Sequence, residues 1–83
     1  MKVGRILRIA RKICDISETE VAKRIGISRS YLCMIEKDER SIQIDLLEKY
    51  ATILDTTALK IVALAEEELT EPDLRREVAK RLW

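Results

Sequence analysis

The sequence contains no histidine and only two cysteines among its 83 residues. A structural zinc site needs four nitrogen or sulfur ligands, and hydrolytic nucleophiles are commonly activated by a histidine. These shortages exclude a four-ligand Cys/His zinc site and both the Cys/His and Ser/His catalytic pairs. The chain also lacks a glycine-rich phosphate loop and an evident carboxylate pair. We therefore expect no enzymatic activity, and no metal ion, cofactor or small-molecule ligand.

Long hydrophobic runs are missing too, since no apolar segment approaches the roughly twenty residues that cross a bilayer. The basic start MKVGR leads into a periodic helical pattern and not into the apolar core of a signal peptide. We expect a soluble, cytoplasmic protein with no membrane partner. In a reducing cytoplasm, a disulfide between Cys14 on an inner helix face and Cys33 on an outer one is not expected.

A strong net charge is likewise absent, because 16 Lys and Arg face 15 Asp and Glu and leave +1. The charges are unevenly placed, however. Residues 1–40 carry ten basic and six acidic side chains, a balance of +4, whereas residues 41–83 carry six and nine, a balance of −3. The N-terminal half is therefore the candidate nucleic-acid-binding half.

Helical periodicity runs through the whole chain. Residues 2–14 predict an amphipathic helix that ends at Asp15 and has a basic outer face. Residues 45–54 predict another helix, and Thr57 is placed to cap a further one that is apolar nearly all the way round as far as Leu69. Thr70 and Asp73 predict a capping box that restarts the chain as a C-terminal helix. The fold class is all-α.

Between these helices, residues 16–40 predict two short capped helices joined by a glycine turn. Ser17 stands three residues before Glu20, which is the spacing of a capping box, and Ser28 is the next N-cap. Gly26 can adopt the positive φ that stops the first helix at once. The second helix then has a core face and an outer face, which is the arrangement of a helix-turn-helix.

These residues resemble the phage-repressor or Cro-type (xenobiotic-response-element type) helix-turn-helix regulators over roughly residues 2–65. The matching positions are Ile16-Ser17, Glu20-Val21-Ala22, Ile25-Gly26-Ile27-Ser28, Leu32 and Ile35-Glu36. The resemblance implies a lambda-repressor-like domain of five helices, here with an extra C-terminal helix. In such proteins the second helix of the motif enters the DNA major groove, usually in a dimer on a two-fold operator.

The resemblance also assigns functional positions. The base-facing residues would be Arg29, Ser30, Cys33 and Met34, and the backbone-contacting residues would be Arg11, Ser28, Tyr31, Lys37 and Arg40. Arg11 would in addition form an ion pair with Glu36. Of the basic residues on the first helix, only the one nearest the reading helix is expected to touch a phosphate.

This chain departs from the family pattern at three positions. Glu18 stands where a phosphate-binding Gln is common, and Asp38 and Ile42 replace a common Gly and Pro. A carboxylate at position 18 repels phosphate. Cys33 and Met34 hydrogen-bond poorly, so they can contact thymine methyl groups or form part of a patch that binds protein.

We accordingly predict a helix-turn-helix domain over residues 1–69 and a dimerisation helix over residues 70–83. The expected function is a sequence-specific regulator, in the form of a repressor, that binds double-stranded DNA as a homodimer. The alternative is a helix-turn-helix scaffold used as a protein-interaction module, such as an antitoxin or adaptor. The expected dimer contacts are Ile61, Leu64, Leu74, Val78 and Leu82, because the helix after Thr57 has more apolar faces than one small core covers.

Overall fold

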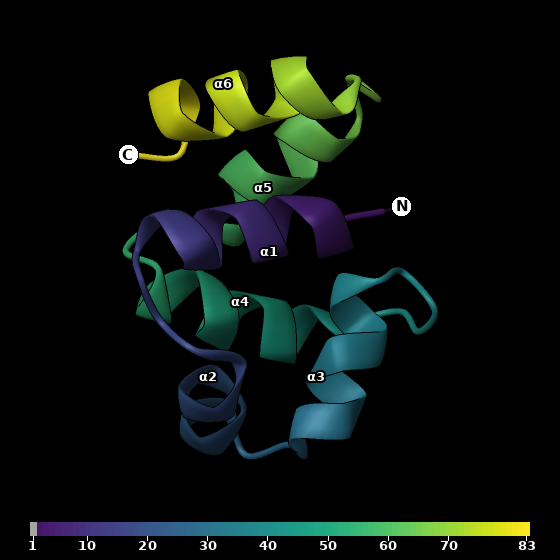
Figure 1. The fold of residues 1–83 in the computed structure, drawn as a ribbon, viewed down its shortest axis with the longest axis vertical. Coiled ribbons are helices and arrows are strands. Elements are labelled where there is room, and N and C mark those ends of the chain that lie inside the picture. The colour runs from purple at the N-terminus through teal and green to yellow at the C-terminus, as the bar shows by residue number, and fades with distance from the viewer. Residues whose placement is uncertain (1) are drawn as a thin grey trace.

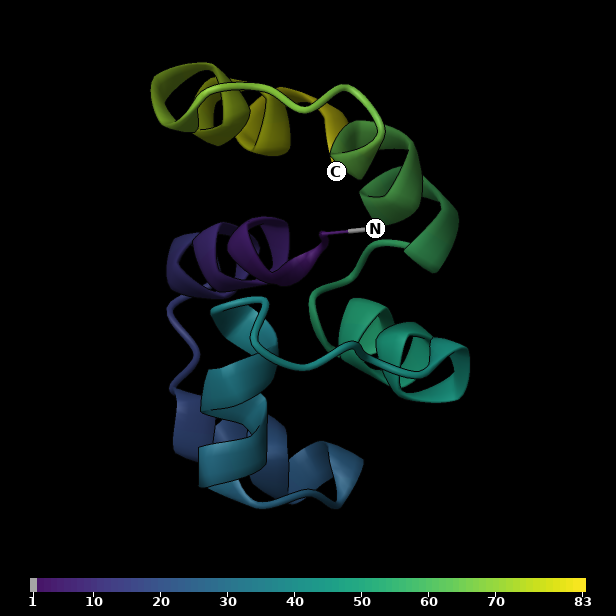
Figure 2. The ribbon, with the colours of Figure 1, turned by 90° about the vertical axis from the view of Figure 1, so that its right-hand side faces the viewer.

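The computed structural model describes residues 2–83, and this part of the chain is built from helices without strands. The helices are α1 (Gly4–Ile13), α2 (Glu18–Ile25), α3 (Arg29–Glu36), α4 (Ile44–Ile53), α5 (Ala58–Ala65) and α6 (Glu71–Arg81). They form three tiers, with α5 and α6 at the top, α1 and α4 in the middle, and α2 and α3 at the bottom (Figures 1 and 2). The predicted all-α class is confirmed. No helix within residues 2–83 is long and apolar enough to span a bilayer.

Side-chain caps start three of the helices where the sequence predicts them. The Ser17 hydroxyl accepts the Glu20 N–H at 3.1 Å, the Ser28 hydroxyl accepts the Tyr31 N–H at 3.0 Å, and the Thr57 hydroxyl accepts the Lys60 N–H at 3.2 Å. Each bond satisfies a backbone donor that has no partner within the helix.

Two details of the predicted capping boxes are wrong. The Glu20 carboxylate does not reach back to Ser17, because it accepts a hydrogen bond from Arg24 Nε at 2.7 Å, one turn further along α2. At the start of α6 the Thr70 hydroxyl donates to the Asp73 carboxylate at 3.2 Å and accepts no backbone N–H. The competing partners are charged groups within the same turn or the next, and charge-assisted bonds are the stronger ones.

The helix ends depend on left-handed backbone conformations. Gly26 has a φ of 78° and Asp15 a φ of 56°, as the sequence predicts. Asp38 and Glu68 also take positive φ, at 59° and 50°. The turn at Glu68 follows the end of α5 at Ala65, so Leu69 lies in the connection to α6 and not in the helix that the sequence predicts.

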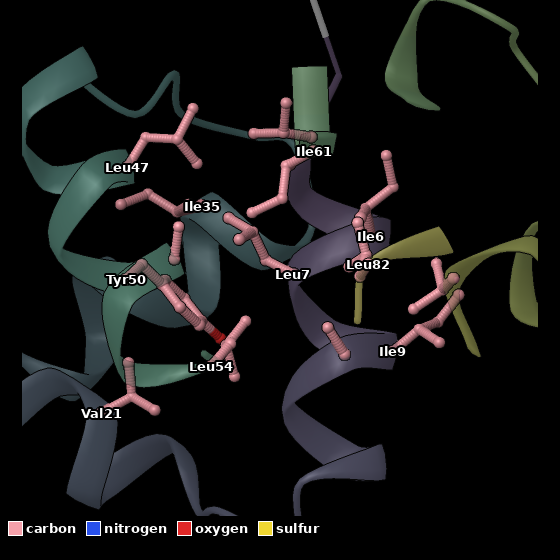
Figure 3. Close-up of a cluster of buried hydrophobic side chains, with 14 of the residues drawn as sticks. Ile6, Leu7, Ile9, Val21, Ile35, Leu47, Tyr50, Leu54, Ile61 and Leu82 are labelled. Atoms are coloured by element: carbon pink, nitrogen blue, oxygen red, sulfur yellow. The ribbon is translucent and has the colours of Figure 1, made fainter. Parts of the chain in front are cut away.

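One hydrophobic core runs through all six helices, and Figure 3 shows its centre. It is built from residues on the inner faces predicted by the helical periodicity, among them Ile6, Leu7, Leu32, Leu47 and Leu54, which are at most 1% exposed. The helical periodicity of residues 2–14 places Ile13 on the inner arc of α1, but Ile13 is 48% exposed. It occupies the last turn of α1, beside a surface hollow that it shares with Arg75.

The predicted dimer contacts lie inside the single chain. Ile61 is 0% exposed and Leu64 1%, and the whole stripe on α6 (Leu74, Val78, Leu82) is at most 3% exposed. The reason is that α6 folds back onto α1 and α5, as both ribbon views show, and covers the second apolar face of α5 itself (Figures 1 and 2). The prediction that these five side chains face a second subunit is therefore wrong for the folded chain.

Polar contacts fasten α6 in that position. Arg81 forms a two-pronged ion pair with Glu67, which holds the pKa of the Glu67 carboxyl below its usual value. The Trp83 indole N–H donates to the Leu54 carbonyl at 2.6 Å, and Arg5 of α1 donates to the Leu69 carbonyl at 3.3 Å. Both ends of α6 are thus tied to the rest of the domain.

Candidate nucleic-acid interface

The Gly26 turn sets α3 against α2 with one face outward. Leu32 and Ile35 of α3 are buried, whereas Arg29 and Ser30 are exposed and Cys33 and Met34 are half-buried. The four residues predicted to face bases therefore share the side of α3 turned away from the core. Of the four, Cys33 also lines a hollow beside α3.

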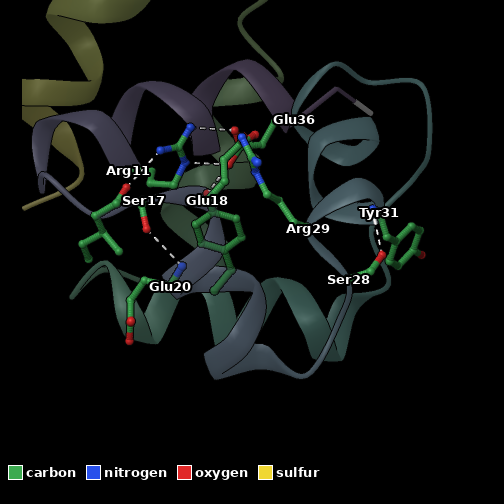
Figure 4. Close-up of polar contacts among 10 residues, drawn as sticks. Arg11, Ser17, Glu18, Glu20, Ser28, Arg29, Tyr31 and Glu36 are labelled. Carbon is green, nitrogen blue, oxygen red and sulfur yellow. Dashed lines mark hydrogen bonds and ion pairs between the residues drawn. The ribbon is translucent and has the colours of Figure 1, made fainter.

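A buried polar network holds α3 in place. Arg11 donates to the Glu36 carboxylate through Nε at 2.9 Å and through Nη2 at 3.0 Å (Figure 4). The Tyr50 hydroxyl donates to the same carboxylate at 2.6 Å. The Arg11 and Glu36 side chains are 9% and 2% exposed. This ion pair, implied by the family resemblance, joins α1 to α3, and Tyr50 adds α4. In the sequence, Tyr50 is marked only by its place on the core face of a predicted helix.

These contacts shift the pKa values of Arg11 and Tyr50. The hydrogen bond with Glu36 raises the pKa of Arg11 above its ordinary value. Burial, assisted by the hydrogen bond to Glu36, raises the pKa of the Tyr50 phenol well above its ordinary value of 10. Arg11 also donates to the Ile16 carbonyl at 2.9 Å. Its guanidinium is committed inside the protein, so the structure corrects the predicted phosphate contact and gives Arg11 a positioning role.

The predicted departure at Glu18 has a specific partner. The Glu18 carboxylate lies 3.7 Å from Nε of Arg29, so that the first residues of α2 and α3 form an ion pair (Figure 4). The Glu18 side chain is 22% exposed and the Arg29 side chain 70%. Glu18 therefore occupies the N-terminus of α2 and also pairs with Arg29, the main candidate for base recognition.

The other predicted backbone contacts surround α3. Ser28 is exposed and its hydroxyl caps α3, while Lys37 is exposed at the opposite end of the helix. Arg40 lies over the ring of Tyr31, with its guanidinium carbon 5.8 Å from the ring centroid, which is the geometry of a cation–π contact. Tyr31 is half-buried against the core, so its ring has a packing role as well.

A basic hollow of about 340 Å³ opens beside α3. It is lined by Arg8, Arg11, Lys12, Glu18, Cys33, Glu36 and Lys37. Arg8 and Lys12 of α1 thus stand next to the outer face of α3. The basic outer arc of α1 was the signal for them, but the periodicity of one helix does not say which of its residues approaches another helix. Within residues 2–83, no cluster of side chains suited to a metal ion is present.

A capped helix, a glycine turn and a second helix with a free polar face together define a helix-turn-helix protein. Residues 7–61 match the Helix-turn-helix family, and the chain belongs to that family. The chain is 32% identical to the immunity repressor protein of Bacillus phage phi105 over an alignment that covers 99% of this chain and 60% of the phage protein. It therefore spans about 60% of the length of that relative.

Solved structures share the fold. The biofilm regulator SinR in complex with DNA aligns with a TM-score of 0.66 at 30% identity, covering 72% of this chain and 97% of that one. The DNA-binding domain of SinR from Bacillus subtilis gives the same score and identity and is covered to 88%. A SinR/SinI protein complex aligns with a TM-score of 0.70 at 28% identity and covers 93% of this chain and 78% of the other.

Proposed function

We propose that this protein is a sequence-specific double-stranded DNA-binding repressor of transcription that acts in the cytoplasm. The observation that carries the proposal is the free outer face of α3, which presents Arg29 and Ser30 beside a hollow rich in basic side chains. The similarity to a phage immunity repressor and to a SinR chain that binds DNA supports it. Repression follows if the bound protein blocks access of polymerase to the promoter.

In this proposal α3 enters the major groove and places Arg29, Ser30, Cys33 and Met34 against base edges. An arginine at the start of such a helix fits bidentate recognition of guanine, and the Cys33 and Met34 side chains fit the methyl group of thymine. Ser28, Lys37 and Arg40 would contact phosphates on either side and fix the register of the helix. These contacts make the affinity depend on salt.

The proposal includes a homodimer on a two-fold operator, with reading helices about 34 Å apart. Because Ile61 and Leu64 are buried, a dimer contact has to use apolar side chains that remain exposed. Among residues 2–83, Leu59 of α5 is the most exposed large one at 78%, followed by Ile44 at the start of α4 at 60%. We assign the dimer contact to Leu59 and its surroundings on α5.

Selection of bound sequences from a random duplex library tests the proposal directly. A palindromic consensus with half-sites one helical turn apart is the expected result, and it would establish DNA binding and two-fold geometry together. Failure of the folded protein to enrich any sequence at low salt would contradict the proposed function. A consensus without symmetry would contradict the homodimer alone.

Arg29→Ala tests whether Arg29 recognises a base. The variant should bind the selected operator about 1–3 kcal/mol more weakly and lose preference at one position of each half-site, because a bidentate contact to guanine is removed. Titration against operators changed at each position measures both effects. Equal weakening on every sequence would instead identify Arg29 as a phosphate contact.

A protein partner is the second candidate. The SinR/SinI complex that aligns with 93% of this chain favours it, because that alignment extends beyond the helix-turn-helix. The poorly hydrogen-bonding pair Cys33 and Met34 would then belong to a protein-binding surface. A mobility-shift experiment with the DNA upstream of the protein's own coding sequence separates the two functions, since a pure interaction module gives no shift.

A further inference from the structure

We propose that Arg8 and Lys12 of α1 and Arg75 of α6 form a basic strip that binds the DNA backbone outside the helix-turn-helix. The strip would hold phosphates that flank the half-site and would contribute affinity without sequence preference. This inference rests on the proposed function, because it assigns an additional part of the same DNA interface.

The strip is continuous with the outer face of α3. On one side, Arg8 and Lys12 line the hollow of about 340 Å³ that also contains Cys33 and Lys37 of α3. On the other side, the same two residues line a smaller hollow of about 100 Å³ together with Arg75 of α6. Both ribbon views place α1 between α3 and α6, so α1 is the bridge between the two surfaces (Figures 1 and 2).

The three side chains are exposed, and none has an ion-pair partner within residues 2–83. The acidic groups that border the two hollows are already engaged. Glu71 pairs with Arg5 at 3.4 Å, and Glu18 pairs with Arg29 at 3.7 Å. The strip therefore retains its full positive charge.

Neighbouring arginines on α6 behave differently. Arg76 lies 3.5 Å from Asp73, and Arg81 binds Glu67 and Glu77. Arg75 is the arginine of α6 that points to α1 and remains unpaired in the described chain. Unpaired cations gathered on one surface repel one another, and a polyanion laid across them removes that repulsion and releases its own counterions.

Duplex DNA is the polyanion that fits this surface, because the strip joins the face that would read the bases. The family match ends at residue 61, so α6 lies outside the matched helix-turn-helix. The contribution of Arg75 would thus be an addition of this chain to the motif. Contacts from such a strip reach the sugar-phosphate backbone and carry no base information.

The test compares Arg75→Gln with Arg76→Gln. These substitutions remove the same charge from adjacent exposed positions of one helix, and only the first lies in the strip. We expect Arg75→Gln to weaken binding both to the selected operator and to an unrelated duplex. The slope of the logarithm of the association constant against the logarithm of the salt concentration should become less negative by about 0.9. As the salt concentration rises from about 50 to about 200 mM, the ratio of the wild-type affinity to the Arg75→Gln affinity should fall about three- to four-fold. Arg76→Gln should match the wild type.

Phosphate-ethylation interference locates the contact. The wild type should show interference at backbone positions outside each half-site, and Arg75→Gln should lose the part of it that Arg75 causes while keeping the remaining signals. Equal affinities, salt slopes and interference patterns for Arg75→Gln and Arg76→Gln would overturn the inference. A wild-type protein that binds no duplex at all would overturn the proposed function instead, so the two failures are distinguishable.

Discussion

At the scale of single residues, the Glu36 carboxylate connects three helices. It accepts hydrogen bonds from Arg11 on α1 and from Tyr50 on α4, and it is itself part of α3. A buried charge is tolerated only when it is paired and hydrogen-bonded, and here each oxygen has at least one donor. The network therefore holds α3 in place from its inner side.

Tyr50→Phe should lower the free energy of unfolding by about 1.5–3 kcal/mol, because a hydrogen bond to a buried charged group is lost. Urea unfolding at neutral pH measures the change. An unchanged free energy of unfolding would show that the hydrogen bond from Tyr50 to Glu36 makes no net contribution to stability.

Tyr50→Phe should also change how the stability of the protein depends on pH. The pKa of Tyr50 is raised in the folded protein, so its stabilising contribution is fully present below pH 10 and is lost as the pH rises above that value. The wild type should therefore lose stability above pH 10 more steeply than Tyr50→Phe. Parallel curves for the two proteins would contradict the assignment.

Glu18→Gln is expected to raise DNA affinity about two- to five-fold, since an exposed charge interaction is worth about 0.3–1 kcal/mol. The substitution frees Arg29 from its ion pair and removes a negative charge from the N-terminus of α2, while the Ser17 cap stays in place. Fluorescence titration with the selected operator measures the affinity. Glu48→Gln, which removes the same charge at an exposed position of α4, is the control. A lower or unchanged affinity would show that α2 does not approach the DNA backbone.

At the scale of the elements, the start of α1 lies very close to the end of α3. Gly4 begins α1 directly over the end of α3, where its N–H donates to the Asp38 carboxylate at 3.0 Å. A Cβ at this position would stand 2.8 Å from both the Glu36 carbonyl oxygen and the Asp38 carboxylate, and closer still to the Ile35 carbonyl. Asp38, in its left-handed conformation, therefore replaces the common glycine of the family and also binds α1.

Gly4→Ala should consequently destabilise the domain by about 1–3 kcal/mol, because backbone atoms of α3 have to move to accept the methyl group. Thermal unfolding measures the effect. Arg8→Ala, at an exposed position of the same helix, should change stability by no more than about 0.5 kcal/mol. Equal stabilities for the two variants would contradict the close-approach argument.

At the scale of the whole molecule, α6 closes the core that α5 leaves open. An eleven-residue helix with one apolar stripe does within the chain what a second subunit was expected to do. The homodimer that we propose therefore has a smaller apolar surface to use, around the exposed Leu59 of α5.

A pair of lysine substitutions on α5 tests this arrangement. Ile61→Lys should prevent folding, because burying an unpaired ammonium costs several kcal/mol and a domain of this size has only about 5–15 kcal/mol of stability. Leu59→Lys should fold normally and bind the operator more weakly as a monomer. Circular dichroism and sedimentation give the two readouts. A folded, monomeric Ile61→Lys protein would restore the idea that this face joins two subunits.

The sequence by itself determined the class of fold and the location of the helix-turn-helix. Caps such as Ser28, the Gly26 turn and the spacing of apolar residues act within one or two turns, so they can be recognised without knowing the rest of the molecule. For the same reason Arg29 and Ser30 could be placed on an outer face from their positions alone.

Only the tertiary structure decided what covers each apolar face and which distant charges meet. An apolar stripe on α5 has the same sequence pattern whether α6 or a second subunit buries it, because the hydrophobic effect depends on area removed from water and not on its source. Likewise the periodicity of α1 exposes four basic residues, but packing alone commits Arg11 to Glu36 and brings Arg8 and Lys12 between α3 and Arg75 of α6. Such long-range juxtapositions have no local signature, and they define the part of the proposed interface that the motif does not contain.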